Sequence, residues 1–312
     1  MVGTTLGLQN QTELQTYYYT EPRDQTANIV SVCLMMVIFV TGVIGNGLVI
    51  FVIGYKMKTT VNSIWFLNLA ITDFIFIPIL VYIIVVIFDS KVSENILLYE
   101  CGYFIFVLNM FASAFFLTVI SLDRCMCTWC VVWAQNKRTL VKARIICVFV
   151  WLLAICCSIP FAVSIFQPRF FTQIYTNYTS LSIYMFTVGF LIPFLIITSS
   201  YIAIGVRIRR FPRRNQLRIF RVIFVILAFF ISWFPFHFQQ LFIDFAHYND
   251  WDSRVLHIFY EASVFIIGLV FLSSSLNPIL YVFMCDEYKK KLKTSLLLVF
   301  EGAFTEDHLG LH

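Results

Sequence analysis

Charged residues are scarce in this chain of 312 residues. Lys, Arg, Asp and Glu together make up 12% of it, whereas 60% of the residues are hydrophobic and 35 are Phe. A soluble domain of this length needs far more charge, because the surface that faces water is where ionised side chains gather. The shortage of charge excludes an ordinary soluble domain and predicts an outer surface that contacts lipid.

Seven stretches of the sequence lack charge over a length that can cross a bilayer, with one of them interrupted only by Asp73. A transmembrane helix needs about 20 mostly uncharged residues. Helices satisfy their own backbone hydrogen bonds in lipid, whereas a β-barrel would show short alternating segments. We therefore predict an all-α membrane protein, a bundle of seven transmembrane helices. The charged residues that bound these stretches are at 24–56, 58–89, 100–123, 144–169, 169–207, 221–244 and 261–286.

Basic residues are shared unevenly between the loops that these spans define. If the N-terminus is outside, 18 of the 22 Lys and Arg residues fall on the cytoplasmic side. Such an excess is typical of cytoplasmic loops, so we predict an extracellular N-terminus. The four basic residues left outside are Arg23, Lys91, Arg169 and Arg254.

No linker rich in Pro, Gly or Ser divides the chain, and no internal repeat supports an inverted-repeat transporter. We predict an extracellular tail at 1–26 without a cleavable signal peptide, a transmembrane domain at 27–285 and a cytoplasmic segment at 286–312. In the last of these, Tyr288, Leu292 and Leu296 recur near helical spacing with lysines opposite. This pattern predicts an amphipathic helix on the membrane surface, with lipids as partners.

The segments predicted to be extracellular carry candidate modification sites. Asn10 and Asn177 each begin an Asn-x-Thr triplet, which is an acceptor for N-glycosylation. Three tyrosines near acidic residues are candidates for sulfation, and the alternative is a disordered aromatic tail. These tyrosines are Tyr17, Tyr18 and Tyr19.

Polar side chains inside the spans are few, and such residues are costly in lipid. No basic residue lies at the depth of Asp73, so its carboxyl group must be protonated, hydrated or paired with a cation. Asn109 and Ser113 are one helical turn apart and share a face. One carboxylate with Asn and Ser oxygens suits a hard monovalent cation. The alternative is that these groups only hydrogen-bond between helices.

Motifs along nearly the whole chain resemble those of rhodopsin-like G-protein-coupled receptors, in the same order. They are Asn46, Leu69-Ala70-x-x-Asp73, Asp123-Arg124-Cys125, Trp151, Pro193 with Tyr201, Trp233-Phe234-Pro235, and Asn277-Pro278-Ile279-Leu280-Tyr281. The stretches "LNMFASAFFLTVISLDRC" and "VWAQNKRT" are similar to the chemoattractant group, which includes the formyl-peptide, chemerin and second prostaglandin D receptors. The resemblance implies a plasma-membrane receptor without enzymatic activity.

The resemblance also implies an activation switch at the cytoplasmic end of the third helix. Arg124 is expected to pair with Asp123 at rest and to turn toward Tyr201 and Tyr281 when a heterotrimeric G protein of the inhibitory class binds. Arrestin is a further expected partner, and no nucleic acid is expected. The alternative is a static surface salt bridge. Pro235 weakens the helix backbone and offers a hinge. The expected switch residues are Asp123, Arg124, Tyr201, Trp233, Pro235, Asn277, Pro278 and Tyr281.

Two further sites are implied by the same resemblance. A bound Na+ that favours the resting state is expected among Asp73, Asn109, Ser113, Ser274 and Asn277, and no other cofactor is expected. An extracellular ligand, a peptide or a lipid, is expected to contact Phe104, Phe106, Val107, Met110, Phe236, His237, Gln240, His257, Tyr260 and Glu261, with Phe111, Phe234 and Val264 as additional candidates.

Charge favours a cationic or amphipathic peptide as the ligand. The predicted external segments carry ten acidic and four basic residues, which leaves them near −6, and no Lys or Arg is expected in the outer half of a helix. An acidic face attracts cationic ligands. The alternative is an ordinary solvated acidic rim.

Two departures from the family pattern bear on function. The second outer loop, "FQPRFFTQIYTNYT", has no Cys, so the disulfide that most relatives form there with the third helix cannot form in its usual way, and Cys101 is 23 positions before Arg124. Val131 stands where the relatives have Pro. These departures leave two alternatives open: a decoy receptor that does not signal and a constitutively active receptor. A transporter or channel, which would need a continuous polar path, is a separate alternative.

Overall fold

The computed structural model describes the backbone at residues 25–88, 95–166, 178–208, 213–249, 251 and 253–284. Side chains within these ranges are described except at 25–28, 96, 164–166, 178, 208, 213–226, 247–248, 253–257, 260–261 and 279–284. The described backbone is helical apart from short turns and contains no strand. The predicted all-α fold is confirmed.

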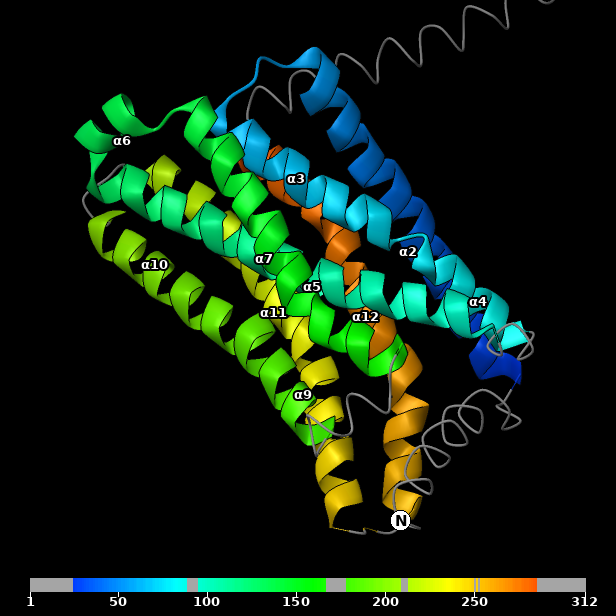
Figure 1. Cartoon of the computed structure of the whole chain (residues 1–312). Helices are drawn as coiled ribbons and strands as arrows, with labels where there is room; N and C mark the ends of the chain where they lie inside the picture. The colour runs from blue at the N-terminus through cyan, green and yellow to red at the C-terminus, as the bar shows by residue number, and fades with distance from the viewer. Residues whose placement is uncertain are drawn as a thin grey trace, which may run out of the picture.

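Seven membrane-length helical segments lie side by side in a bundle (Figure 1). They are α2 (Gln25–Phe51) with η1 (Val52–Lys56), α3 (Val61–Phe76) with α4 (Ile79–Phe88), α5 (Ile96–Trp129), α7 (Leu140–Phe166), α9 (Tyr178–Phe186) with η3 (Thr187–Leu191) and α10 (Ile192–Ile208), α11 (Arg213–Tyr248), and α12 (Ser253–Met284).

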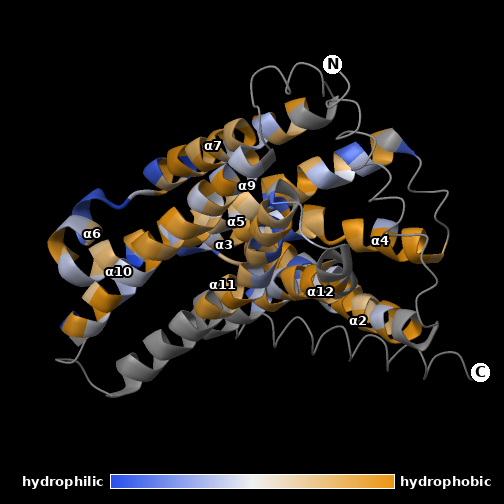
Figure 2. Ribbon diagram, turned by 90° about the horizontal axis from the view of Figure 1, so that it is seen from below, coloured by the Kyte–Doolittle hydropathy of each residue, from blue (hydrophilic) through white to orange (hydrophobic). Residues whose placement is uncertain are grey.

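Five of these segments are long and apolar enough, among the described residues, to cross a membrane. They are Ile29–Lys56, Val61–Phe88, Leu97–Trp129, Leu140–Val163 and Thr179–Arg207, and Ala262–Pro278 in α12 is a shorter apolar helix. Figure 2 shows hydrophobic residues along most of the bundle, with hydrophilic ones gathered near α6 and the start of α7.

The helices extend beyond the charge-free stretches that predicted them. The third begins at Ile96 rather than after Glu100, and the seventh begins at Ser253 rather than after Glu261. Charged residues at the end of a span lie where water can solvate them, so they do not end the helix. Arg254 therefore belongs to the first turn of α12. The prediction that no basic residue lies in the outer half of a helix is wrong at this position.

The segment after the third span is a short helix. α6 (Val131–Lys137) follows α5 directly, with Cys130 between them. Val131, Val132 and Trp133 are all exposed on it. Proline is tolerated in the first turn of a helix, because the N–H that it lacks has no partner there. The presence of Val131 where the relatives have Pro therefore does not explain why this segment is helical.

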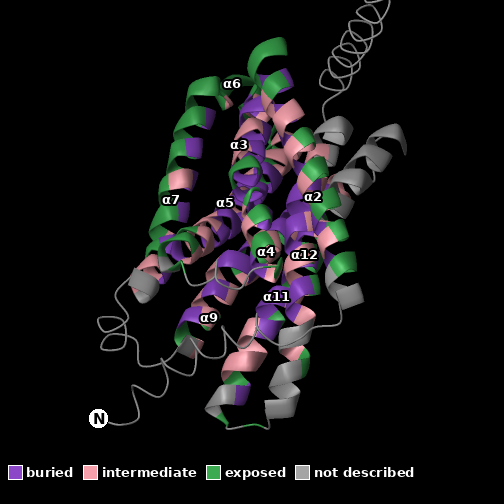
Figure 3. Ribbon diagram, turned by 90° about the vertical axis from the view of Figure 1, so that its right-hand side faces the viewer, coloured by how far each residue is buried: buried purple, intermediate pink, exposed green. Residues whose placement is uncertain are grey.

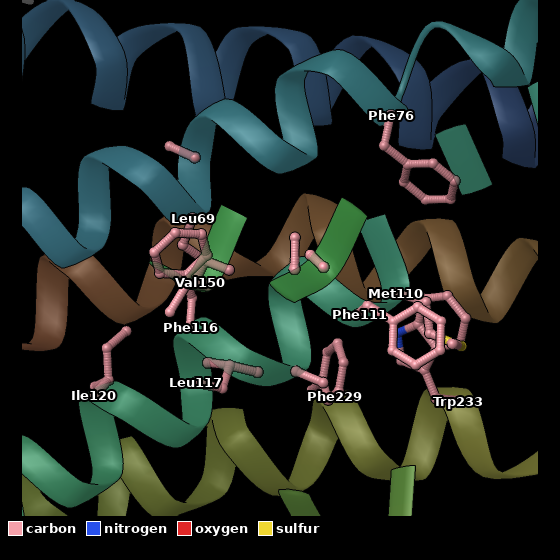
Figure 4. Close-up of a cluster of buried hydrophobic side chains, with 14 of the residues drawn as sticks. Leu69, Phe76, Met110, Phe111, Phe116, Leu117, Ile120, Val150, Phe229 and Trp233 are labelled. Carbon is pink, nitrogen blue, oxygen red and sulfur yellow. The ribbon is translucent and has the colours of Figure 1, made fainter. Parts of the chain in front are cut away.

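α5 is the central helix of the bundle and packs against α3, α7 and α10, while α12 packs against α2 and α11. Figure 3 shows the buried residues along the interior of the bundle and mostly exposed residues on α7. Figure 4 shows part of the resulting core, with Leu69, Phe111, Phe116 and Trp233 drawn among its members. The exposed side of α7 carries large apolar side chains such as Phe149, which suits a helix that faces lipid rather than water.

Small residues allow α2 to approach its neighbours closely. A Cβ atom at Gly42 would lie 2.5 Å from Ile77 Cδ1 and 2.6 Å from Ser275 Oγ, and one at Gly45 would lie 3.0 Å from Pro278. The Ser275 hydroxyl donates a hydrogen bond to the Ile38 carbonyl oxygen of α2. Glycine at membrane-helix contacts brings backbones together in this way.

The cysteines differ from one another in their environment. Cys147 is buried, whereas Cys33, Cys101, Cys130 and Cys156 are exposed. None of the eight cysteines that the structure describes forms a disulfide. Cys101 is thus a free thiol near the N-terminal end of α5.

Candidate functional site

The Asp73 carboxylate joins three helices at the centre of the bundle. Its Oδ2 accepts a 2.7 Å hydrogen bond from Asn277 Nδ2 of α12, and its Oδ1 accepts a 3.3 Å bond from Asn109 Nδ2 of α5. The Ser274 side chain also hydrogen-bonds with Asp73. Asp73 has no exposed surface, so these bonds replace the water that the carboxylate would otherwise bind.

Ser113 and Asn46 extend this cluster to further contacts. Ser113 Oγ lies 3.2 Å from the hydroxyl oxygen of Thr72, the residue before Asp73. Asn46 Nδ2 donates to the carbonyl oxygens of Gly42 at 3.1 Å and Ser274 at 3.2 Å. Thr72 was not among the predicted site residues. The sequence signal that could have indicated it is a hydroxyl directly beside the lone intramembrane acid.

The cluster has the side-chain oxygens that a sodium ion needs, but its hydrogen bonds must rearrange before the ion can bind. The side-chain oxygens of Asp73, Asn109, Ser113 and Ser274 are ligand types that hard cations prefer. Asn109 Oδ1 is buried and accepts no hydrogen bond from any described residue, so it is available as a ligand. The Asn277 amide nitrogen, however, donates directly to Asp73. A cation beside Asp73 must displace that N–H group.

Metal ions of other kinds have no site in the described part of the chain. No three His, Cys, Asp or Glu side chains come together there in an arrangement that could hold a metal. The polar cluster is therefore a hydrogen-bonding centre with one carboxylate.

An aromatic cluster surrounds Trp233 on the next level of the bundle. Its ring centroid lies 5.5 Å from that of Phe106, 5.9 Å from Phe229 and 5.9 Å from Phe236, in tilted or edge-on geometry. Such pairs contribute beyond their buried area. Figure 4 shows Trp233 beside Met110 and Phe111 of α5. Phe106 and Phe236 are therefore in direct contact with Trp233.

Most of the residues predicted to contact a ligand lie in or near this aromatic cluster. The buried ones are Phe106, Val107, Met110, Phe111, Phe236, His237 and Val264, and Phe104 and Gln240 are half-buried. The side chains of His257, Tyr260 and Glu261 are not among those described. Phe234 is 52% exposed and packs on Phe190 and Phe238. Its suggested place in the pocket is wrong, because one residue after Trp233 the helix has turned by about 100°.

His237 is the polar member of the aromatic cluster. It is buried, and neither ring nitrogen has a hydrogen-bond partner among the described residues. Its ring centroid lies 5.0 Å from that of Phe190 and 5.9 Å from that of Phe186. A buried polar atom without a partner is costly, so His237 presents two nitrogens to which an inserted polar group could bind.

Gln239 links α11 to α12. The residues predicted from the sequence to form the site include its neighbour Gln240 but not Gln239. It is buried, and its Nε2 donates to the Phe259 carbonyl oxygen and to Ser263 Oγ. The sequence places two glutamines side by side in an apolar span, and only the helix register distinguishes them. This pair of bonds holds the C-terminal half of α11 and the N-terminal half of α12 together.

At the opposite end of the bundle, Asp123 is held by Arg138. Arg138 Nε and Nη2 donate to Asp123 Oδ1 and Oδ2, each at 2.7 Å, and Nη2 also donates to Asn62 Oδ1 at 2.5 Å. Partial burial lowers the pKa of Arg138, but hydrogen bonding and charge from Asp123 outweigh it and raise that pKa overall. The geometry is bidentate, the strong arrangement for an arginine and a carboxylate.

The expected resting pair between Asp123 and Arg124 is therefore not formed in this structure. Consecutive residues on a helix do not face each other, whereas Arg138 comes from the turn between α6 and α7 and can approach Asp123 head-on. Arg124 Nε and the Tyr201 hydroxyl are both buried, and neither has a hydrogen-bond partner among the described residues. The two side chains lie within electrostatic range of each other.

The remaining predicted residues are distributed as follows. Pro235 and Pro278 lie inside α11 and α12, where each removes one backbone hydrogen bond. Tyr281 lies on α12, and its side chain is not among those described. The candidate modification sites and the predicted amphipathic helix are also outside the described residues. They are Asn10, Asn177, Tyr17, Tyr18, Tyr19 and 286–312.

Comparison with known proteins defines the class. The family of seven-transmembrane receptors of the rhodopsin type matches residues 45–281, and the chain belongs to that family. It is therefore a multi-pass plasma-membrane receptor that couples to a G protein, and not an enzyme.

Individual relatives place the chain among receptors of the chemoattractant type. It is 37% identical to a C3a anaphylatoxin chemotactic receptor of Danio rerio, over 89% of this chain and 78% of that protein. It is 32% identical to chemerin-like receptor 1 of Rattus norvegicus, over 91% and 82% of the two chains. It is also 32% identical to formyl peptide receptor 2 of Mus musculus, over 89% of this chain and 86% of that protein.

Replacing Arg138 by Gln is expected to lower the melting temperature of the purified receptor, because Asp123 loses a bidentate partner. The expected loss in the free energy of unfolding is about 1–3 kcal/mol, as for a hydrogen bond to a charged group. Lys137→Gln is the matched control, because Lys137 is exposed one residue earlier. Equal melting temperatures for the two variants would show that the Arg138 contact does not stabilise the protein.

Proposed function

We propose that this receptor has an extracellular N-terminus, binds a cationic or amphipathic peptide of the chemoattractant type, and activates a heterotrimeric G protein of the inhibitory class, with arrestin as a second cytoplasmic partner. The observation that carries the proposal is the separation of Arg124 from Asp123. A half-buried arginine whose guanidinium is not bound to its neighbouring acid is available to a partner that enters the cytoplasmic end of the bundle.

The opposite end of the bundle supports the choice of ligand. The acidic residues Glu100 of α5 and Asp244 of α11 lie near the outer ends of their helices, Glu100 buried and Asp244 half-buried. Below them lie Phe106, Phe236 and Trp233. A ligand that presents a basic group to the acids and an apolar side chain to the rings matches both features. The C3a and formyl-peptide receptors among the relatives are named for peptides.

The aromatic cluster and the inner switch are connected through α11. A ligand that moves Phe236 acts on Trp233, which lies two residues before Pro235 on the same helix. Proline removes a hydrogen bond and allows the helix to bend there. A ligand shifts such an equilibrium only by binding one arrangement more tightly than the other. The proposed ligand therefore favours the arrangement in which Arg124 faces Tyr201.

Replacing Arg124 by Ala tests the signalling function. In cells that express the native chain, we expect at least one peptide named for a relative, C3a, chemerin or a formyl peptide, to lower cAMP and to dissociate an inhibitory G protein. Arg124→Ala should reduce this response at least about tenfold, equivalent to roughly 1.4 kcal/mol, at equal surface expression. Lys137→Ala should not reduce it.

The other outcomes identify the alternatives. Uptake of ligand without G-protein activation would make the protein a decoy receptor, and full activity without ligand would make it constitutively active. A response to prostaglandin D2 alone would identify a lipid ligand. A peptide response that does not weaken at high salt would contradict electrostatic recognition.

We also propose that Na+ binds at Asp73 and stabilises the resting arrangement by displacing Asn277. Sodium should raise the melting temperature of the native receptor relative to potassium at equal ionic strength. Asp73→Asn should abolish the difference, because it removes the one charge in the cluster. Sodium sensitivity that persists in Asp73→Asn would exclude this site.

A further inference from the structure

Trp129, the last residue of α5, joins this helix to α10 at the end of the bundle that carries α6. The two helices run side by side toward that end (Figure 1). Trp129 Nε1 donates a 3.1 Å hydrogen bond to the Ala203 carbonyl oxygen, and the guanidinium carbon of Arg207 lies 5.6 Å from the centroid of the Trp129 ring. Ala203 and Arg207 are four residues apart and share a face of α10. One side chain therefore makes two contacts with one turn of α10, and we call these two contacts the α5–α10 clamp.

The Trp129 ring is the main contact that the structure gives to the charge of Arg207. Among the described residues, Arg207 forms no ion pair, and its Nε is buried without a hydrogen-bond partner. An arginine within about 6 Å of the face of a tryptophan is attracted by the ring, and the attraction grows as water is excluded. The ring therefore stabilises the guanidinium and fixes where the side chain lies.

The alternative is that Trp129 is only a membrane anchor. Tryptophan is enriched at the membrane–water interface, where its N–H group meets water or lipid headgroups. Trp129 is 47% exposed, as an anchor is. Its N–H group, however, donates to a backbone carbonyl oxygen of the neighbouring helix. A backbone acceptor moves only with its helix, so this bond ties the end of α5 to the position of α10.

The α5–α10 clamp lies close to Arg124 and Tyr201, on the same two helices. Trp129 is five residues after Arg124, about 7.5 Å along α5, and Arg207 is six residues after Tyr201, about 9 Å along α10. Arg124 and Tyr201 lie within electrostatic range, but the Tyr201 hydroxyl has no hydrogen-bond partner among the described residues. No hydrogen bond holds Tyr201 at Arg124. Its place there therefore depends on how α10 lies against α5.

We propose that Trp129 and Arg207 are positioning residues for the receptor function, because the α5–α10 clamp holds α10 against α5 so that Tyr201 faces Arg124. The clamp contains no residue of α11, so bending of α11 at Pro235 leaves it intact. The proposal rests on the proposed function for the role of Arg124, and it adds two residues that act through Tyr201.

The test is fluorine NMR of the purified full-length receptor with 3-fluorotyrosine in place of Tyr201, in detergent without ligand or G protein. Arg124→Gln shows in which direction the signal moves when the positive charge is removed. Trp129→Leu removes both contacts of the clamp and Arg207→Gln removes one. Each should move the signal in that same direction, and the double variant should match Trp129→Leu alone. Arg207→Lys keeps a cation over the ring and should stay nearer to the native signal.

The matched controls are Trp133→Leu and Lys137→Gln, because each removes an exposed residue of the same kind from α6. Neither should move the fluorine signal. A signal that is unchanged in Trp129→Leu and Arg207→Gln, or that moves equally in the controls, would overturn the proposal, and so would shifts that add in the double variant. Should Trp129→Leu fail to fold, Trp129→Phe keeps an aromatic ring, loses only the N–H bond, and should give a smaller shift in the same direction.

Nucleotide exchange on an inhibitory G protein gives the second readout. Arg207→Gln should lower it about threefold, the size expected for the loss of one cation–π contact. In a Tyr201→Phe background the same substitution should lower it no further. A full additional loss there would show that Arg207 does not act through Tyr201 and would contradict the proposal. If the native chain activates no G protein, the proposed function fails, while the fluorine signal still decides whether the clamp positions Tyr201.

Discussion

The arrangement of the bundle depends on one carboxylate that is fully enclosed by protein. Asp73 accepts hydrogen bonds from Asn277 and Asn109, and Asn46 donates to the backbone of Ser274 beside it. Four helices, α2, α3, α5 and α12, are therefore tied at one level. Because an intramembrane charge is tolerated only with partners of its own, these helices cannot separate without leaving Asp73 unsatisfied. The centre is thus held by polar contacts, and movement is left to the two ends.

The two ends use different chemistry. Around Trp233, the rings of Phe106 and Phe236 pack in tilted or edge-on contacts that involve no charged group. At the end of the bundle that carries α6, Asp123 is fixed by a bidentate bond to Arg138, and Arg124 is left beside Tyr201. This division suits the proposed receptor function, because a ligand can rearrange the aromatic cluster while Asp123 stays in place and the half-buried Arg124 meets a partner. In that proposal, signalling depends on where Arg124 points, and Arg138 holds the acid that could otherwise bind it.

The sequence predicted the fold correctly because its main signal is the spacing of charges, which lipid restricts strongly. It also placed Asp73, Asn109 and Asn277 in one candidate site, and both asparagine amides donate to Asp73 in the structure. It did not predict the partner of Asp123, because adjacency along the chain suggested Arg124, whereas the bidentate contact comes from a turn 15 residues later. Phe234 and Gln239 were misjudged for a similar reason. One residue turns a helix by about 100°, and composition does not reveal which of two neighbours faces inward.

The most direct test of this account is a double-mutant cycle between Asp73 and Asn277. The free energy of unfolding is measured for the native receptor, Asp73→Asn, Asn277→Ala and the double variant, in detergent and without sodium. If the carboxylate ties α3 to α12, the two losses are not additive, and the coupling is about 0.5–2 kcal/mol. Additive losses would show that Asp73 and Asn277 act independently, and they would contradict the claim that this bond holds the centre of the bundle together.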